Sequence, residues 1–313
     1  MAVVIQLVLL AVGFVLLVKG ADWFVEGASK LAEKFGIPQL VIGLTIVAMG
    51  TSLPEAAVSV SAALKGSAEI TIGNIVGSNI MNVLLILGIT SVITPIAVQM
   101  STIKYEIPFV VAISVLLAGI GLTDHVVGRT DGIILWVLMI CYLLYLLRMS
   151  KAGADMSGKE QDAGGDMPVW KMLLLILAGG VMIVVGSDVA VDAATELARI
   201  FGMSERLIGL TIVAFGTSLP ELVTSATAAV KGKADIAVGN IVGSNIFNIL
   251  FVVGTSALIT PVAYAADFMV DSIVCIAAVV LLWMLVFRKH RLGRLGGVCM
   301  LAGYAAYFMY LLR

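Results

Sequence analysis

The sequence predicts an all-α membrane protein in which ten transmembrane helices form two inverted five-helix repeats with broken helices at the centre. The 313-residue chain is 61% hydrophobic and 12% charged, and its mean hydropathy is +1.12. Its apolar segments are long enough to cross about 30 Å of hydrocarbon as helices. The sequence of the first half also recurs 166 residues later. These features exclude an ordinary soluble protein and a β-barrel, whose strands would be short and alternating.

Ten apolar segments are expected to span the membrane, and the first is expected to be a retained helix because no basic region or cleavage site accompanies it. Residues 20–37 and 186–203 resemble each other, are amphipathic, and are expected to extend the first helix of each half. Three cysteines lie far apart within apolar segments and are expected to be packed and inert. The predicted spans are residues 2–19, 38–64, 70–95, 106–123, 130–148, 169–190, 205–230, 236–260, 268–287 and 294–312.

The chain is predicted to divide into a first repeat (1–150), a polar linker (151–168) and a second repeat (169–313). Five spans per repeat give the two repeats opposite orientations. The loops on one side of the membrane hold 14 of the 19 Lys and Arg residues, and cytoplasmic loops carry the excess of such residues. We therefore expect a multi-pass protein of the inner membrane, with both termini outside the cytoplasm and a flexible cytoplasmic linker.

The most informative repeated motif is G-T-S-L-P-E, at residues 50–55 and 216–221 within the longer repeats 41–88 and 207–254. Proline inside a helix removes a backbone hydrogen bond, and the glycine before it weakens the helix further. In a membrane, broken backbone persists only where protein or a water-lined cavity satisfies it. We expect the freed carbonyls, around Ala48 and Ala214, to bind a cation.

Polar residues recur at helical spacing around each break and in G-N-I-V-G-S-N, the motif that follows it. Every side chain offers oxygen, and neither His nor Cys lies near, so the set favours Ca²⁺ and Na⁺ over zinc or copper. The glycines of the second motif are also expected to allow close helix packing. The stripes are Thr51, Glu55 and Ser59 with Ser52; Asn74, Ser78 and Asn82; Thr217, Glu221 and Ser225 with Ser218; and Asn240, Ser244 and Asn248.

The two glutamates carry the functional argument. An ionised carboxylate at mid-bilayer costs about 2.5–3.5 kcal/mol on insertion scales, and two that face each other repel unless one is protonated or a cation intervenes. One Ca²⁺ neutralises Glu55 and Glu221 together, and several Na⁺ do so in part. Site occupancy therefore couples one ion to another, or an ion to a proton, which favours exchange over a purely structural role.

These residues resemble the repeats of the Ca²⁺/cation antiporter superfamily, in particular the prokaryotic sodium/calcium exchangers. The resemblance covers nearly the whole chain. It implies an antiporter without cofactors that exports Ca²⁺ against inward Na⁺, switching access as helices 2–34 and 169–200 slide over a rigid core. Backbone oxygens of Ala48 and Ala214 would serve outer sodium positions. The implied central sites comprise Glu55, Glu221, Thr51, Ser52, Ser78, Asn82, Thr217, Ser218, Ser244 and Asn248.

One position departs from part of the family. Some relatives, and the potassium-dependent branch, carry Asp where this chain has Asn248. The departure argues against potassium coupling, leaves two central carboxylates where those relatives have three, and leaves the ion stoichiometry open.

Three alternatives remain beside the sodium/calcium antiporter. A Ca²⁺/H⁺ exchanger is the strongest, because glutamates carry protons, although such relatives resemble G-N-x-x-E more than G-T-S-L-P-E. An intramembrane hydrolase is disfavoured because the only histidines, His125 and His290, lie near loops, and Asp188 and Asp192 lack protease geometry. A channel would need rings of like groups, usually at an oligomer axis. The sequence suggests no nucleic-acid ligand and no obligatory protein partner beyond the lipid bilayer.

Overall fold

The computed structural model describes residues 2–66, 68–157, 167–203, 214–265 and 268–312. Within these ranges the chain is helical apart from turns and four two-residue strands. Seven helices are long and apolar enough to cross a membrane, and a bent pair, Gln39–Thr51 with Leu53–Leu64, would make an eighth. The fold is that of a helical membrane protein with several spans.

The helices follow the predicted order. Short π-helical stretches, labelled η, interrupt the helices that carry the repeated motifs, and another precedes α7. In the first half the elements are α1 (Ala2–Phe35), α2 (Gln39–Ile42), η1 (Gly43–Val47), α3 (Ala48–Thr51), α4 (Leu53–Leu64), α5 (Glu69–Ile80), η2 (Met81–Ile86), α6 (Leu87–Ile93), η3 (Thr102–Glu106), α7 (Ile107–Asp124) and α8 (Arg129–Ser157). In the second half they are α9 (Val169–Ile200), α11 (Ala214–Thr217), α12 (Leu219–Val230), α13 (Ala234–Phe247), η5 (Asn248–Val253), α14 (Gly254–Ile259), α15 (Phe268–Phe287) and α16 (Arg294–Leu311).

Two short antiparallel ribbons join loops of the first half to loops of the second. Strand β1 (Ile96–Ala97) pairs with β4 (Arg291–Leu292), so that Ile96 faces Leu292. Strand β2 (Val126–Val127) pairs with β3 (Val262–Ala263), so that Val127 faces Val262. Strand β3 lies 166 residues after β1, so these two strands are equivalent in the two halves, and each belongs to a different ribbon.

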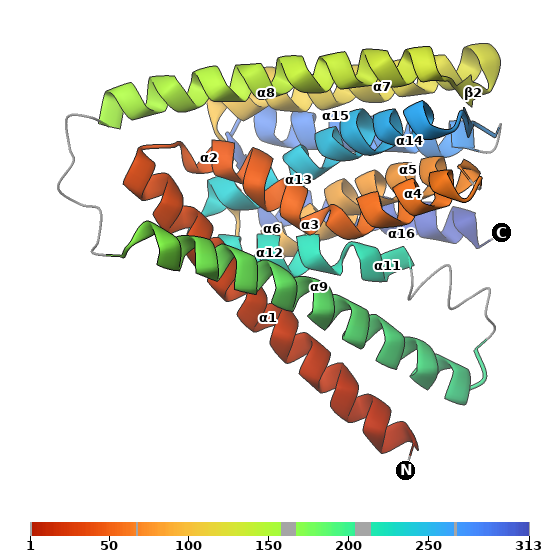
Figure 1. The fold of residues 1–313 in the computed structure, drawn as a ribbon, viewed down its shortest axis with the longest axis horizontal. Helices are drawn as coiled ribbons and strands as arrows, with labels where there is room; N and C mark the ends of the chain where they lie inside the picture. Colours follow the sequence, from red (N-terminus) through yellow and green to blue (C-terminus); the bar gives the residue numbers. More distant parts are fainter. Residues whose placement is uncertain (1, 67, 158–166, 204–213, 266–267, 313) are drawn as a thin grey trace.

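Helices α1 and α9 lie side by side and run diagonally past the remaining helices (Figure 1). Glycines line their contact: a Cβ on Gly20 would meet the Gly179 carbonyl oxygen at 2.8 Å, and one on Gly13 would meet the Gly186 carbonyl oxygen at 2.9 Å. Small residues let membrane helices approach this closely. Only 17% of the most apolar part of α1 is buried, so most of this pair faces outward.

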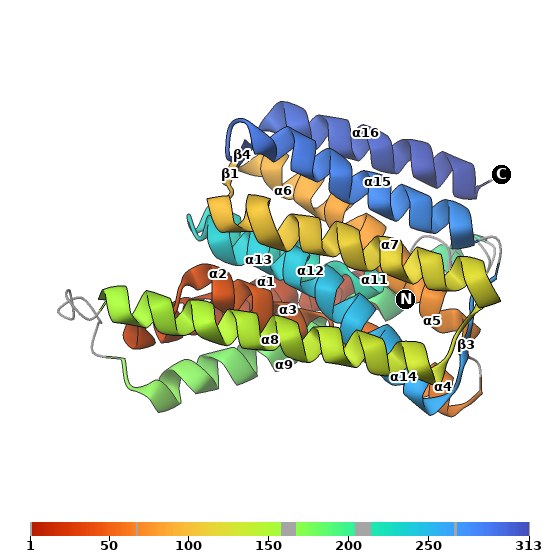
Figure 2. The same cartoon turned by 90° about the horizontal axis from the view of Figure 1, so that it is seen from above.

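The centre of the molecule is the span formed by α13, η5 and α14. It is 94% buried over its most apolar part. Helices α7 and α8 pack against it, and α15 and α16 lie farther out, on the side of α6 (Figure 2). The equivalent span of the first half, formed by α5, η2 and α6, is 78% buried. The two segments that carry G-N-I-V-G-S-N therefore form the core.

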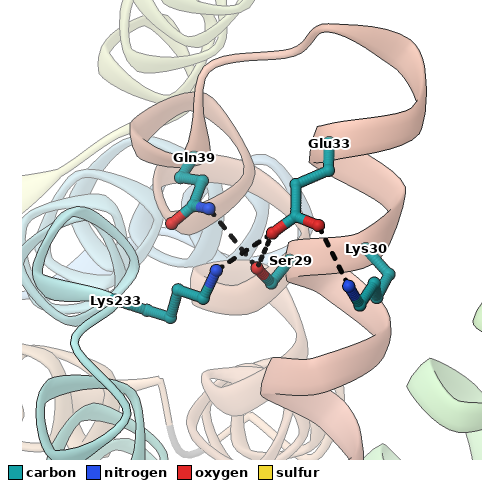
Figure 3. A network of polar contacts seen from close by, with 5 residues as sticks. All are labelled: Ser29, Lys30, Glu33, Gln39 and Lys233. Carbon is teal, nitrogen blue, oxygen red and sulfur yellow. Dashed lines mark hydrogen bonds and ion pairs between the residues drawn. The ribbon is translucent and has the colours of Figure 1, made fainter. Parts of the chain in front are cut away.

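The C-terminal end of α1 is attached to the turn between α12 and α13. Gly36 follows α1 in the left-handed region (φ 61°) and ends the helix as a C-terminal cap. Just before it, the Lys233 ammonium lies 3.0 Å from Glu33 Oε1. Ser29 and Lys30 also contact the Glu33 carboxylate, and Gln39 donates to Ser29 (Figure 3).

Most predicted spans coincide with helices, and the differences have local causes. Helix α8 continues to Ser157, seven residues into the expected linker, because adding residues to an existing helix costs less than starting a new one; residues 158–166 lie outside the described residues. Helix α16 forms in the expected place but is not among the candidate spans, because Arg294, three glycines and three tyrosines dilute its apolar residues. The start of the 205–230 span also lies outside the described residues.

Candidate cation-binding site

Each G-T-S-L-P-E motif interrupts its helix at the serine. In the first half Ser52 separates α3 from α4, and the helix axis bends by 51°. Pro54 lies in the first turn of α4 and has no N–H to offer to the carbonyl of Gly50, four residues earlier. Ser218 and Pro220 occupy the same positions between α11 and α12. The predicted break is therefore present in both halves.

The break leaves a different carbonyl without a helical partner from the one the sequence suggested. The Ala48 carbonyl still accepts a backbone hydrogen bond from Ser52, at 3.0 Å. Because Pro220 has no N–H, the carbonyl of Gly216, four residues earlier, lacks its helical donor. This carbonyl instead accepts a hydrogen bond from Ser187 Oγ on α9 at 2.9 Å. Ala48 and Ala214, the first residues of α3 and α11, therefore remain only predicted ligands.

The two serines at the breaks contact the glutamates of the opposite halves. Ser52 Oγ donates to Glu221 Oε1 at 2.8 Å, and Ser218 Oγ donates to Glu55 Oε1 at 3.4 Å. Ser244 Oγ lies 3.5 Å from Glu221 Oε1, and Ser78 lies beside the Glu55 carboxylate. The structure therefore brings these predicted residues together in one site shared by both halves.

Both glutamates are fully buried, each with 0% relative exposure. Among the described residues no Lys, Arg or His is buried with them. Four acceptor oxygens at the centre have no hydrogen-bond partner: Oε2 of both glutamates and Oδ1 of Asn82 and Asn248. A buried acceptor without a partner costs about 1–3 kcal/mol. Four such oxygens, two of them on carboxylates, form a set of ligands suited to a hard cation.

Another layer of hydrogen bonds holds the broken helices to their neighbours. Asn74 Nδ2 donates to Ser59 Oγ at 2.9 Å, and Asn240 Nδ2 donates to Ser225 Oγ at the same distance. Thr51 Oγ1 donates to Asn240 Oδ1 at 2.9 Å, and the same hydroxyl also lies beside the Glu221 carboxylate. Asn74, Asn240 and the two serines therefore support the site rather than supply free oxygens to it. Thr217, like Thr51, precedes the serine at its break.

Sequence reasoning missed two asparagines at the contact between the halves. Asn79 and Asn245 are each 1% exposed and donate to each other's backbone carbonyl at 3.3 Å. A signal was available, because both belong to the repeated G-S-N triplet. They lie outside the stripe of Ser78 and Asn82, and the helical spacing therefore left them out. Ser187 was missed because its counterpart in the first half is Ala21, so it does not recur.

Comparison with known proteins identifies a family over both halves of the chain. The family model described as sodium/calcium exchanger protein matches residues 5–148 and 171–313. The chain is 41% identical over 312 residues to the inner membrane protein YrbG of Escherichia coli K12, covering 95% of this chain and 93% of that protein. It is 30% identical over 350 residues to the sodium/calcium exchanger MaX1 of Methanosarcina acetivorans, covering 99% of each.

Solved structures give the same result for the fold. The structure of the sodium-calcium exchanger NCX_Mj soaked with 2.5 mM Na⁺ and 0.1 mM Ca²⁺ matches with a TM-score of 0.83 and 33% identity, over 96% of this chain and 97% of that one. NCX_Mj soaked with neither Na⁺ nor Ca²⁺ matches with a TM-score of 0.84. The chain therefore belongs to the sodium/calcium exchanger family, a family of membrane transporters and not of enzymes.

Proposed function

We propose that this protein is an antiporter that exports Ca²⁺ by admitting Na⁺, binding both ions in turn at the site between Glu55 and Glu221. The observation that carries the proposal is the set of four buried oxygens without hydrogen-bond partners, two from each half. They offer two negative charges and two neutral dipoles to a cation. Ca²⁺ binds such oxygens and balances the two carboxylates when both are ionised.

The same charges explain how transport of the two ions could be coupled. With no buried basic residue among those described, the carboxylates repel each other unless cations or protons screen them. Na⁺ ions that bind the same oxygens compete with Ca²⁺ electrostatically. An empty site with two ionised carboxylates is costly to bury, which disfavours movement of the unloaded carrier and favours exchange over leak.

The proposed architecture has ten spans in two inverted repeats, with both termini outside the cytoplasm of an inner membrane. The recurrence of contacts at the repeat offset supports it: Ser52 contacts Glu221 as Ser218 contacts Glu55. The family model also matches each half separately. The excess of Lys and Arg on one side supports the orientation.

Alternating access would arise from movement of α1 and α9 over the buried core. Glycines let these two helices pack closely against each other, so that they can move as one unit. The core spans, by contrast, are held together by side-chain hydrogen bonds between the halves. Movement of the outer pair therefore breaks fewer polar contacts than movement within the core.

The proposal is tested by ⁴⁵Ca²⁺ uptake into proteoliposomes loaded with Na⁺. Uptake is expected when the external medium lacks Na⁺ and is expected to disappear when the internal Na⁺ is replaced by K⁺. Vesicles with only a pH gradient test the Ca²⁺/H⁺ alternative. Uptake driven by the pH gradient without Na⁺ would replace the proposed sodium coupling with proton coupling. Absence of Ca²⁺ uptake under every gradient, in vesicles shown to contain folded protein, would reject both.

A further inference from the structure

The two asparagines that sequence reasoning missed form a closed hydrogen-bonded group with two site residues. Asn79 lies at the end of α5 and Asn245 in α13, and each donates to the other's backbone carbonyl. Asn82 Nδ2 donates to Asn245 Oδ1 at 3.0 Å, and Asn248 Nδ2 donates to Asn79 Oδ1 at 3.1 Å. Four buried carboxamides therefore connect the halves beside the glutamates.

Hydrogen-bond chemistry determines which way each carboxamide faces. A backbone carbonyl can only accept, so the atom of Asn245 facing the Asn79 carbonyl must be its nitrogen. The oxygen of Asn245 then faces Asn82, and Asn82 must present its own nitrogen there. The oxygen of Asn82 is left without a partner, as it is in the structure. The same sequence of constraints runs from Asn79 to Asn248.

The oxygens left over belong to the glutamate site. Asn248 lies one helical turn after Ser244, whose hydroxyl is 3.5 Å from Glu221, so the two side chains share a helix face. Asn82 stands in the same relation to Ser78 and Glu55. Orientation of these two carboxamides therefore decides whether oxygen or nitrogen is presented to a bound cation.

We propose that Asn79 and Asn245 are positioning residues that fix the oxygens of Asn82 and Asn248 toward the transported cation and require an uncharged hydrogen donor at both positions. An ionised aspartate at 82 or 248 has no hydrogen to offer the oxygen that faces it and would be repelled by it. Asn79 and Asn245 therefore disfavour a third negative charge at position 82 or 248, so that the site keeps two carboxylates, the number that one divalent cation balances. This inference rests on the proposed function.

A double-mutant cycle separates positioning from support of the fold. Asn245→Leu removes the acceptor that holds Asn82, and Asn82→Ala removes the oxygen itself. If Asn245 acts through Asn82, each variant should raise the KM for Ca²⁺ about tenfold, which corresponds to about 1.4 kcal/mol. The double variant should then bind no more weakly than Asn82→Ala alone. Additive losses would overturn the proposal.

Two further variants complete the cycle. Asn245→Asp, in its protonated form, can donate to the Asn79 carbonyl and accept from Asn82. Its KM for Ca²⁺ should therefore be close to the wild-type value, in contrast to the raised KM of Asn245→Leu. Thr90→Val is the structural control, because Thr90 is fully buried in the span of Asn79 and Asn82 and its substitution removes only a hydrogen bond to the Ile86 carbonyl. If Asn245→Leu does not fold, Asn79→Leu and Asn248→Ala provide the equivalent cycle in the other half.

The readouts are Na⁺-driven ⁴⁵Ca²⁺ exchange in proteoliposomes and equilibrium ⁴⁵Ca²⁺ binding to the purified protein. Wild-type protein that neither binds nor exchanges Ca²⁺ would refute the proposed function. Wild-type protein that exchanges Ca²⁺, with Asn245→Leu unchanged in KM or no more affected than Thr90→Val, would refute the positioning role alone.

Discussion

The centre of the molecule and its two outer helices, α1 and α9, differ in how well the halves match. At the centre, contacts recur at the repeat offset: Ser52 and Ser218 each reach the opposite glutamate, and Asn79 and Asn245 bind each other reciprocally. At the outer helices they do not. Ser187 on α9 donates to a carbonyl at the break, whereas the equivalent residue on α1 is Ala21.

Ion pairs show the same difference. The Lys231 ammonium lies 2.5 Å from Asp22 Oδ1 on α1. The equivalent residues are Lys65 and Asp188, and Lys65 forms no ion pair with any described residue. Contacts that build the ion site are thus shared by the halves, whereas contacts that hold the outer helices are not. The shared contacts are expected to decide ion binding, and the unshared ones to decide which conformation the outer helices prefer.

The largest effect is expected at the glutamates, where the halves should be equally sensitive. Glu55→Gln or Glu221→Gln should abolish exchange, because either variant removes one of the two charges that balance Ca²⁺. Folding should persist, since glutamine fills the same volume and removes a buried charge. Proteoliposome exchange and thermal unfolding measure the two properties. Ca²⁺ transport by a well-folded double Gln variant would contradict the site assignment.

The matched control for these variants is Glu106→Gln. Glu106 is another buried glutamate, 1% exposed, and accepts a hydrogen bond from Tyr145 away from the repeated motifs. It should keep exchange near the wild-type rate. Loss of exchange in this variant as well would mean that any buried charge is needed, and not the pair at the centre.

A smaller effect is expected at the crossed serines, where the match between halves is close but unequal. Ser52→Ala removes a 2.8 Å hydrogen bond to a carboxylate, and Ser218→Ala removes one of 3.4 Å. Bonds to charged groups contribute about 1.5–3 kcal/mol, so Ser52→Ala should raise the KM for Ca²⁺ about tenfold or more, and Ser218→Ala less. Equal effects of the two variants on the KM would show that the difference between these two hydrogen-bond distances does not persist during transport.

The repeated part of the molecule was the part that sequence could predict. Two copies of G-T-S-L-P-E place Pro54 and Pro220 inside helices, and the break follows from the chemistry of proline. The glutamates could be predicted because an acidic residue in an apolar span needs a cation or proton partner. Helical spacing then added Ser78 and Ser244, which lie on the same face as the later asparagines.

What could not be predicted depends on contacts between elements distant in the chain. The partner of the Gly216 carbonyl is Ser187, which precedes it by 29 residues and belongs to no repeated motif. Asn79 pairs with Asn245 across 166 residues, and helical spacing within one segment carries no information about that contact. The expectation that Ala48 would lose its helical partner was wrong, because the hydrogen bond removed by a proline is that of the residue four positions before it.

Helix α9 offers a test of the unshared contacts. Ser187→Ala would leave the buried Gly216 carbonyl without its donor, at a cost of about 1–3 kcal/mol. We expect a lower thermal midpoint with no change in the KM for Ca²⁺. A raised KM in Ser187→Ala at an unchanged midpoint would place this serine among the ion-binding contacts instead.

The smallest effect is expected at the ion pair between Lys231 and Asp22, whose side chains are 31% and 37% exposed. Such pairs contribute about 0.2–1 kcal/mol and are screened by salt. Lys231→Gln should therefore lower the thermal midpoint slightly at low ionic strength and not at high. Lys65→Gln is the matched control, since it removes the same charge at the equivalent position, where the described residues provide no partner. If the outer helices prefer one conformation because of this pair, the first variant should also change the ratio of inward to outward exchange rates more than the second. Equal changes in both would show that the difference between the contacts of the two outer helices does not bias transport.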